Sequence, residues 1–135
     1  MKFICLGYAD HAQFGKMTHT ELQQMMEECM EYDDVLRRGG HFTQGEALLD
    51  PSMAKTLRFS NGVVQVSDGP YAETKEQIGG ILVLEAENLE HAVALMSKHP
   101  GVRIGPFEIR PANELVNAMI AEREKQLSFK EAQCI

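Results

Sequence analysis

The spacing of apolar residues along the chain changes between that of strands and that of helices, which predicts an α+β domain. The run FICLGY at 3–8 is apolar at odd and even positions alike, so a strand there would be apolar on both faces. The run ILVL at 81–84 has the same property. Each of these two strands therefore needs a cover on both sides of its sheet.

Three other stretches carry apolar residues at helical spacing. The first begins after Thr18, which has Glu21 three positions later as in a capping box, and it ends at the glycine pair 39–40. Asn88 is placed to cap a second helix, which ends at HPG, residues 99–101. A third helix is predicted from residue 113 onward, followed by a frayed end.

The clearest local signal is Asn61-Gly62, which lies between the alternating runs TLRFS and VVQVS. This dipeptide is typical of a type I′ turn, because both central residues of that turn need a positive φ. The segment therefore predicts a β-hairpin. Its register pairs Phe59 with Val64 and Leu57 with Val66.

Two weaker strands complete the pattern. Residues 41–50 include Gly45, which indicates a bulge or a close backbone approach, and residues 102–111 include Gly105-Pro106, which indicates an edge strand. Without the hairpin, the order is two βαβ units in the split arrangement of a ferredoxin-like domain. The second sheet face must be covered by the C-terminal helix, by another subunit or by both, and we favour a twofold dimer with facing sheets.

Composition narrows the function classes. The 135 residues suit one domain, and a net charge of −7 opposes a nucleic-acid groove, which needs clustered cations. No apolar run approaches the ~20 residues of a membrane span, and the apolar opening lacks the cleavage site of a signal peptide. Cys5, Cys29 and Cys134 lack the spacing of a zinc site or a disulfide framework, so we expect reduced thiols in a cytoplasmic protein. The histidines show no metal pattern, and no cofactor motif is present.

The stretch SDGPYAETKEQIGG at 67–80 resembles the DGPF group of the YCII-related domain family, with Tyr71 where the family motif has Phe. The similarity also includes GEAL at 45–48 and FEIRP at 107–111. It covers residues 1–112, which leaves 113–135 as an extra C-terminal helix and tail. The resemblance implies a ferredoxin-like domain of the dimeric α+β barrel type, here with an inserted hairpin, and no settled activity.

The resemblance also suggests two kinds of role. Some members of the wider family look like enzymes that use a His near the start of the first helix and an Asp before a Pro after the second. In this chain His19 occupies the first place and His99 precedes Pro100 in the second. Some relatives occur beside or fused to extracytoplasmic-function sigma factors, which suggests regulation.

Candidate site residues come from the polar loop and from the strands next to it. For acid–base chemistry we expect His41, Asp68, Glu46 and His19. For ligand contacts we expect Arg58, Glu73, Lys75 and Tyr71. Structural interpretations without a functional role remain open for three of these features. His41 would be a solvent-exposed strand end, Arg58 would form half of a cross-strand ion pair, and the loop would be a solvated turn.

Two function classes therefore remain at the level of the sequence. In the first, the protein is a small dimeric enzyme of lyase, isomerase or hydrolase type. In the second, it is a binding or regulatory module without catalysis. In either case the loop starts at the end of the sheet, where glycines let backbone approach a ligand. We expect residues 68–75 to line the largest polar pocket, near the dimer interface, and to bind a small polar molecule.

Overall fold

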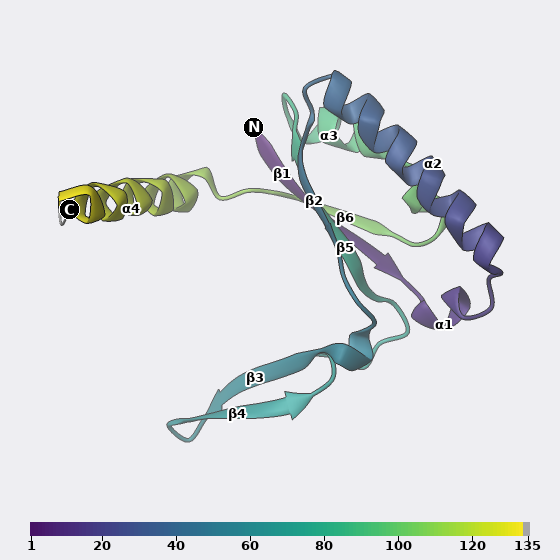
Figure 1. The fold of residues 1–135 in the computed structure, drawn as a ribbon, viewed down its shortest axis with the longest axis horizontal. Coiled ribbons are helices and arrows are strands. Elements are labelled where there is room, and N and C mark those ends of the chain that lie inside the picture. The colour runs from purple at the N-terminus through teal and green to yellow at the C-terminus, as the bar shows by residue number, and fades with distance from the viewer. Residues whose placement is uncertain (134–135) are drawn as a thin grey trace.

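A four-stranded antiparallel sheet forms the centre of the chain in the computed structural model, which describes residues 1–133 (Figure 1). Its strands are β1 (Lys2–Ala9), β2 (Phe42–Ala47), β5 (Gln77–Glu85) and β6 (Phe107–Pro111), in the order β2-β5-β1-β6. This order is the predicted ferredoxin-like topology, and β6 lies at an edge as expected. Within residues 1–133 the sheet stays open and closes no barrel.

Two helices, one long and one short, cover one face of this sheet. The short helix α1 (His11–Phe14) precedes α2 (His19–Arg38), and α3 (Leu89–Met96) follows β5; α2 and α3 lie on the same side in Figure 1. The predicted caps are confirmed, because Thr18 Oγ1 accepts from the Glu21 amide at 3.1 Å and Asn88 Oδ1 from the His91 amide at 2.8 Å. Side-chain oxygens at these positions satisfy amides that a helix start leaves unpaired.

The core lies between these helices and the sheet. Alternate residues of β1 and β5 point into it and are buried, together with Leu36 and Met96 from the helices: Phe3, Cys5, Leu82 and Leu84. The intervening residues lie on the opposite, open face and are half-buried: Ile4, Leu6, Ile81 and Val83. The two-faced apolar pattern is therefore confirmed, and one chain supplies only one of the two covers.

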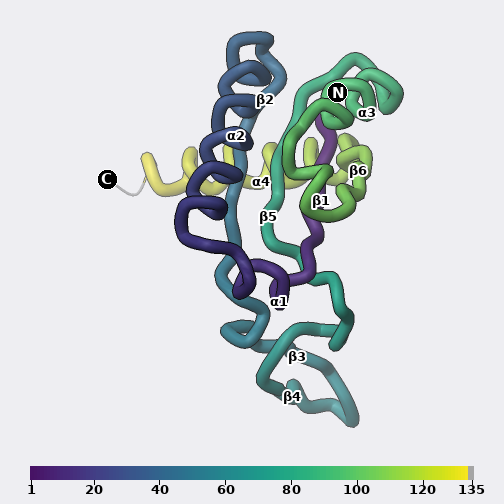
Figure 2. Tube along the Cα trace, turned by 90° about the vertical axis from the view of Figure 1, so that its right-hand side faces the viewer, coloured from purple at the N-terminus to yellow at the C-terminus, as the bar shows by residue number. Residues whose placement is uncertain are grey.

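The inserted hairpin consists of β3 (Lys55–Ser60) and β4 (Val63–Asp68), and it forms a separate two-stranded sheet. Its predicted turn is confirmed by positive φ angles of 52° at Asn61 and 77° at Gly62. The predicted register is confirmed as well, since Leu57 pairs with Val66 and Phe59 with Val64. The hairpin projects beyond the end of the main sheet (Figure 2).

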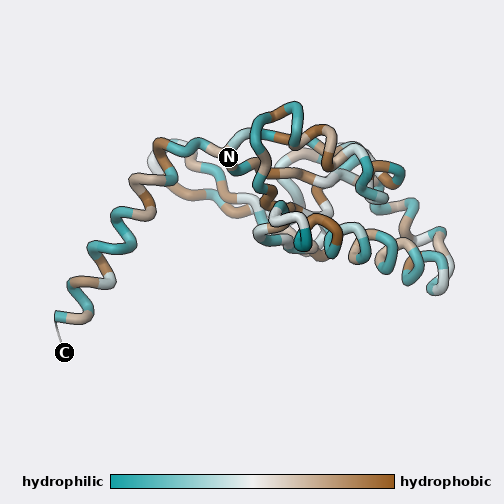
Figure 3. Tube along the Cα trace, turned by 90° about the horizontal axis from the view of Figure 1, so that it is seen from above, coloured by the Kyte–Doolittle hydropathy of each residue, from teal (hydrophilic) through white to brown (hydrophobic). Residues whose placement is uncertain are grey.

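The last helix, α4 (Glu114–Gln133), extends away from the rest of the chain (Figures 1 and 3). None of its residues from 114 to 133 is buried. The C-terminal helix therefore does not cover the open face of its own sheet. Cys134, expected as a free thiol, lies outside the described residues, whereas Cys5 and Cys29 are free thiols.

Two local expectations need correction. Gly45 was expected to mark a bulge or a close backbone approach, but the register of β2 shifts earlier, between Phe42 and Gln44. Gly45 instead makes room for the ring of Phe42, because a Cβ there would lie 2.9 Å from the ring carbon Cζ. The last strand is also shorter than predicted, since residues 100–103 form a 3-10 turn and β6 starts only at Phe107.

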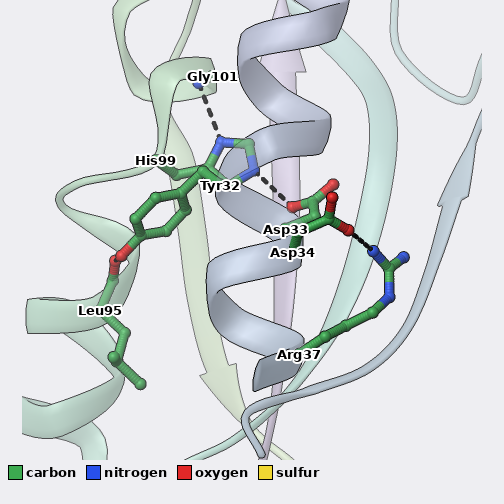
Figure 4. Close-up of polar contacts among 7 residues, drawn as sticks. All are labelled: Tyr32, Asp33, Asp34, Arg37, Leu95, His99 and Gly101. Atoms are coloured by element: carbon green, nitrogen blue, oxygen red, sulfur yellow. Dashed lines mark hydrogen bonds and ion pairs between the residues drawn. The ribbon is translucent and has the colours of Figure 1, made fainter. Parts of the chain in front are cut away.

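A polar cluster ties α2 to the segment after α3 (Figure 4). His99 is only 7% exposed; its Nε2 donates to Asp33 Oδ1 at 2.9 Å, and its Nδ1 accepts from the Gly101 amide at 3.0 Å. The Tyr32 hydroxyl donates to the Leu95 carbonyl at 2.5 Å. An amide can only donate, so this arrangement selects the His99 tautomer with its proton on Nε2.

Candidate functional site

A cavity of about 710 Å³ lies at the base of the hairpin. It is bounded by the end of β1, the end of β2, the start of β5 and the loop 70–77. Its lining residues are Tyr8, Ala47, Leu48, Leu49, Asp50, Pro51, Met53, Ala54, Pro70, Tyr71, Ala72, Thr74, Glu76, Gln77 and Ile78. The volume falls in the range of small-molecule sites, ~300–1,000 Å³.

The wall chemistry of this cavity is mostly apolar, with few polar groups. Two tyrosines, Tyr8 and Tyr71, supply aromatic surface, and aliphatic residues supply most of the rest. The charged side chains among the lining residues are both acidic, Asp50 and Glu76. Because a carboxylate repels an anion and attracts a cation, the cavity suits a neutral or cationic molecule with an apolar body.

The glycine pair that ends the loop motif shapes the inner wall. Gly7 pairs with Gly80, whereas the next residue, Tyr8, pairs with Ile78, so Gly79 is the extra residue of a bulge in β5. A Cβ on Gly80 would lie 3.1 Å from the Glu46 carbonyl oxygen, closer than side chains normally come. A bulge redirects the side chains beyond it, and here it separates the core-packing part of both strands from the part that lines the cavity.

The start of the loop is fixed to the hairpin by backbone hydrogen bonds. Gly69 has a φ of 97°, a conformation that suits glycine. Its amide donates to the Ala54 carbonyl at 2.8 Å, and its own carbonyl accepts from Thr56 Oγ1 at 2.8 Å. The turn that follows Asp68 is therefore held against β3.

The second half of the loop is held by Gln77. Its Nε2 donates to the Ala72 carbonyl at 2.7 Å and lies 3.0 Å from both the carbonyl and the hydroxyl oxygen of Thr74. The Thr74 hydroxyl in turn donates to the Glu76 carbonyl at 2.7 Å. This network holds the loop side of the cavity wall. Among the lining side chains, the groups available to a ligand are the Glu76 carboxylate, the tyrosine hydroxyls and the Asp50 oxygen that does not accept from the Ser52 amide.

His11 is a residue next to this site that sequence reasoning missed. Its Nδ1 lies 3.2 Å from the Ala9 carbonyl oxygen, which can only accept, so Nδ1 carries the proton and Nε2 is left as a base. A Cβ on Gly79 would lie 3.5 Å from that Nε2. Hydrogen bonds from Ser52 lower the pKa of the Asp50 carboxyl, and His11 adds a smaller lowering when its ring is protonated. In the sequence, the one feature that could have pointed to His11 was its position just after β1.

The predicted ligand-contact residues take different places. Tyr71 lines the cavity, while Arg58 lies over the Tyr71 ring at 5.1 Å from its centroid and donates from Nη2 to the Tyr71 carbonyl at 3.2 Å. Arg58 therefore supports the loop from outside. Glu73 and Lys75 are exposed and do not belong to the lining set.

The predicted acid–base residues do not meet at the cavity. Asp68 forms an ion pair with Lys55 across the hairpin. His41 lies at the far end of the sheet, where its Nδ1 is 2.8 Å from the Glu85 carbonyl and its ring packs on His91 of α3. Glu46 pairs with Ile81 on the open face, and His19 is the exposed first residue of α2. The structure thus separates these four residues from one another.

No group of three or more His, Cys, Asp or Glu side chains within residues 1–133 could hold a metal ion. Over the same range, no helix combines the length and apolar character that crossing a bilayer requires.

The chain is thus a small ferredoxin-like protein with a cavity beside a DGPY loop. Comparison with known proteins identifies its family. The chain belongs to the YCII-related domain family, whose model matches residues 1–115. The match thus ends at the start of α4.

Two individual proteins are also similar to the chain. An uncharacterized protein of Rhizobium meliloti is 29% identical over 115 residues, which cover 82% of this chain and 91% of that protein. Among solved structures, 5-chloro-2-hydroxyhydroquinone dehydrochlorinase from Burkholderia phenoliruptrix, in complex with 2,5-dihydroxybenzoquinone, aligns with a TM-score of 0.44. That pair shares 14% sequence identity, over 84% of this chain and 94% of that one.

Proposed function

We propose that the chain acts as a homodimer and binds a small neutral or cationic molecule in the cavity beside the DGPY loop. The observation that carries this proposal is the cavity itself, about 710 Å³ in volume, with apolar walls, two tyrosines and two carboxylates. A pocket with apolar walls and a few placed polar groups is the usual form of a small-molecule site. The fixed loop supports this reading, because a preformed wall costs little ordering on binding.

The homodimer is supported by the surface that one chain exposes. Its accessible area is 10,067 Å² at a mass of 15.1 kDa. A compact monomer of this mass exposes about 7,100 Å², so the chain exposes roughly 3,000 Å² more than expected. Permanent interfaces bury ~2,000–5,000 Å² in total, so a second copy bound to the open side of the sheet could bury an area of this size.

The chemistry of the ligand follows from the groups that remain free. The Gln77 amide and the Thr74 hydroxyl are occupied within the loop. Asp50 and Glu76 accept hydrogen bonds when ionised, and tyrosine rings pack on flat apolar surfaces. We therefore expect a ligand with a ring or short aliphatic body that carries hydroxyl or amine donors.

A panel of matched aromatic compounds tests this binding function. Benzylamine and catechol should raise the melting temperature of the protein, whereas benzoate at equal concentration should not, because its carboxylate would face Asp50 and Glu76. At a hundredfold excess over Kd, binding adds about 2.7 kcal/mol to the free energy of unfolding. Tyr71→Ala should abolish the shift, while Lys75→Ala in the same loop should keep it. A shift caused by benzoate alone, or one unchanged in Tyr71→Ala, contradicts the proposal.

A second candidate function is acid–base catalysis at the edge of the same cavity, and it is favoured by the position of His11. Its Nδ1 is directed to the Ala9 carbonyl, and a Cβ on Gly79, which follows the lining residue Ile78 in the sequence, would lie 3.5 Å from its Nε2. An imidazole with a free Nε2 is a base suited to neutral pH. Exchange of an acidic C–H of a bound ligand in deuterated water, followed by NMR, tests this role. His11→Ala should slow the exchange at least 100-fold and leave the melting shift intact. Equal exchange rates would leave binding as the sole function.

A further inference from the structure

Two exposed apolar surfaces lie outside the cavity. One face of the hairpin, called here the hairpin apolar face, consists of Leu57, Phe59, Val64 and Val66, each between 55% and 75% exposed. On one side of α4, the apolar residues Leu115, Val116, Met119 and Ile120 lie in the first two turns, and Leu127 follows after Arg123 on the same side; these five apolar residues are called here the α4 stripe. Figure 3 shows apolar residues recurring along α4 far from the rest of the chain.

Within residues 1–133 the chain leaves both surfaces exposed. Only two residues connect β6 to α4: the Ala112 amide donates to the Lys2 carbonyl at 2.9 Å, and Asn113 caps α4, since its Oδ1 accepts from the Val116 amide at 3.0 Å. The connection is therefore short, and its first residue is hydrogen-bonded to β1. An isolated two-stranded hairpin is marginally stable at best in water, so the hairpin apolar face needs a cover as well.

The two surfaces are attached to opposite ends of the sheet. α4 leaves beside the first residues of β1, whereas the hairpin is attached where β2 ends and β5 begins. Both project on the side of the sheet opposite α2 and α3 (Figure 1). A twofold axis that crosses the strands exchanges the two ends of the sheet. It therefore brings α4 of one copy to the hairpin end of the other.

We propose that, in the homodimer put forward above, the α4 stripe of each copy packs on the hairpin apolar face of its partner. This inference rests on that proposed dimer. The lengths agree, because the stripe from Leu115 to Leu127 spans about 18 Å at 1.5 Å per helical residue, and a six-residue strand spans about 20 Å. A dimer with this twofold axis would then bury the open sheet face, the hairpin apolar face and the α4 stripe together.

In this dimer, α4 of one copy lies near the cavity of the other. The cavity lies at the base of the hairpin, and its outer wall includes the exposed side chains of Leu49 and Met53. A helix from the partner that packs on the hairpin therefore lies beside this wall. The C-terminal helix, which the family model does not cover beyond residue 115, becomes the element that joins the two subunits at each site.

Site-specific cross-linking of the full chain tests the pairing. Chains carrying Val64→Cys and chains carrying Met119→Cys, with two tags of different size, are co-expressed and joined by a short bismaleimide at pH 8. Both carry Cys29→Ser and Cys134→Ser. Cys5 remains, because burial raises the pKa of its thiol to about 11 and keeps it protonated and unreactive. We expect cross-linking between the two differently tagged chains, at least tenfold above that of either chain alone.

The controls separate this inference from the dimer itself. Lys125→Cys lies on the opposite side of α4 from the stripe, and it should not cross-link to Val64→Cys. If light scattering shows a dimer but the product joins Met119→Cys to Met119→Cys, the pairing is wrong and the dimer stands. If every chain is monomeric at 50 μM, both proposals are overturned.

Discussion

Ile81→Asp should convert the protein into a folded monomer at micromolar concentration. Ile81 lies near the centre of the open face, opposite Leu6 on β1 and Glu46 on β2. In a dimer with facing sheets, the new carboxylate would be buried without a partner in each subunit, which costs several kcal/mol per charge. A loss of about 4 kcal/mol raises the dimer Kd about a thousandfold. Sedimentation velocity across a concentration series measures this shift.

The monomer is expected to keep its fold, because Ile81 is only half-buried in the single chain and Asp there would face water. Circular dichroism should therefore show unchanged helix content. Val102→Asp provides the control, since this exposed position follows α3 on the other side of the sheet. It should leave the Kd within twofold. A dimer of native affinity in Ile81→Asp would remove the open face from the interface.

Much of the fold could be predicted because its signals are local. Asn61-Gly62 needs only its own backbone preferences to specify the hairpin turn, and Thr18 with Glu21 specifies a helix start within one turn. Period-two alternation also identified β1 and β5 as strands with two apolar faces. Topology then follows from a small number of allowed connections.

The candidate site was harder to predict because its contacts are not local. The sequence suggested that Asp68 and Lys75 face the cavity, yet Asp68 pairs with Lys55 and the loop is held by Gln77. The bulge at Gly79 depends on how two strands pair, which no single segment specifies. His11 comes close to Gly79 only after the sheet has formed, so spacing along the chain gave no indication of it.

For the C-terminal helix, the sequence predicted the element but not what packs against it. Its apolar side chains are visible in the sequence and predicted a stripe, but no other segment within residues 1–133 buries that stripe. The sequence left the C-terminal helix, a second subunit or both as covers for the open face. The structure excludes the first within one chain, because α4 projects away from the sheet (Figure 1).

Asp33→Ala should lower the free energy of unfolding by about 1–3 kcal/mol, because it leaves the Nε2–H of buried His99 without an acceptor. His99 lies 66 residues from Asp33 in sequence, and their 2.9 Å hydrogen bond joins α2 to the turn after α3 (Figure 4). Asp33→Asn keeps an oxygen that can accept from Nε2 and should recover most of the loss. Urea titration at one fixed protein concentration measures all three proteins, since oligomerisation would otherwise contribute.

Asp34→Ala is the matched control for this prediction. Asp34 is the next residue on α2, but it is exposed and forms an i,i+3 ion pair with Arg37 at 2.8 Å. Exposed pairs contribute ~0–1 kcal/mol, since water solvates both charges when the pair is broken. The neighbouring substitutions should therefore differ by about 1–2 kcal/mol, even though each removes one carboxylate that accepts a hydrogen bond. Equal losses in the two variants would mean that water reaches His99, and that the helix is held by apolar packing alone.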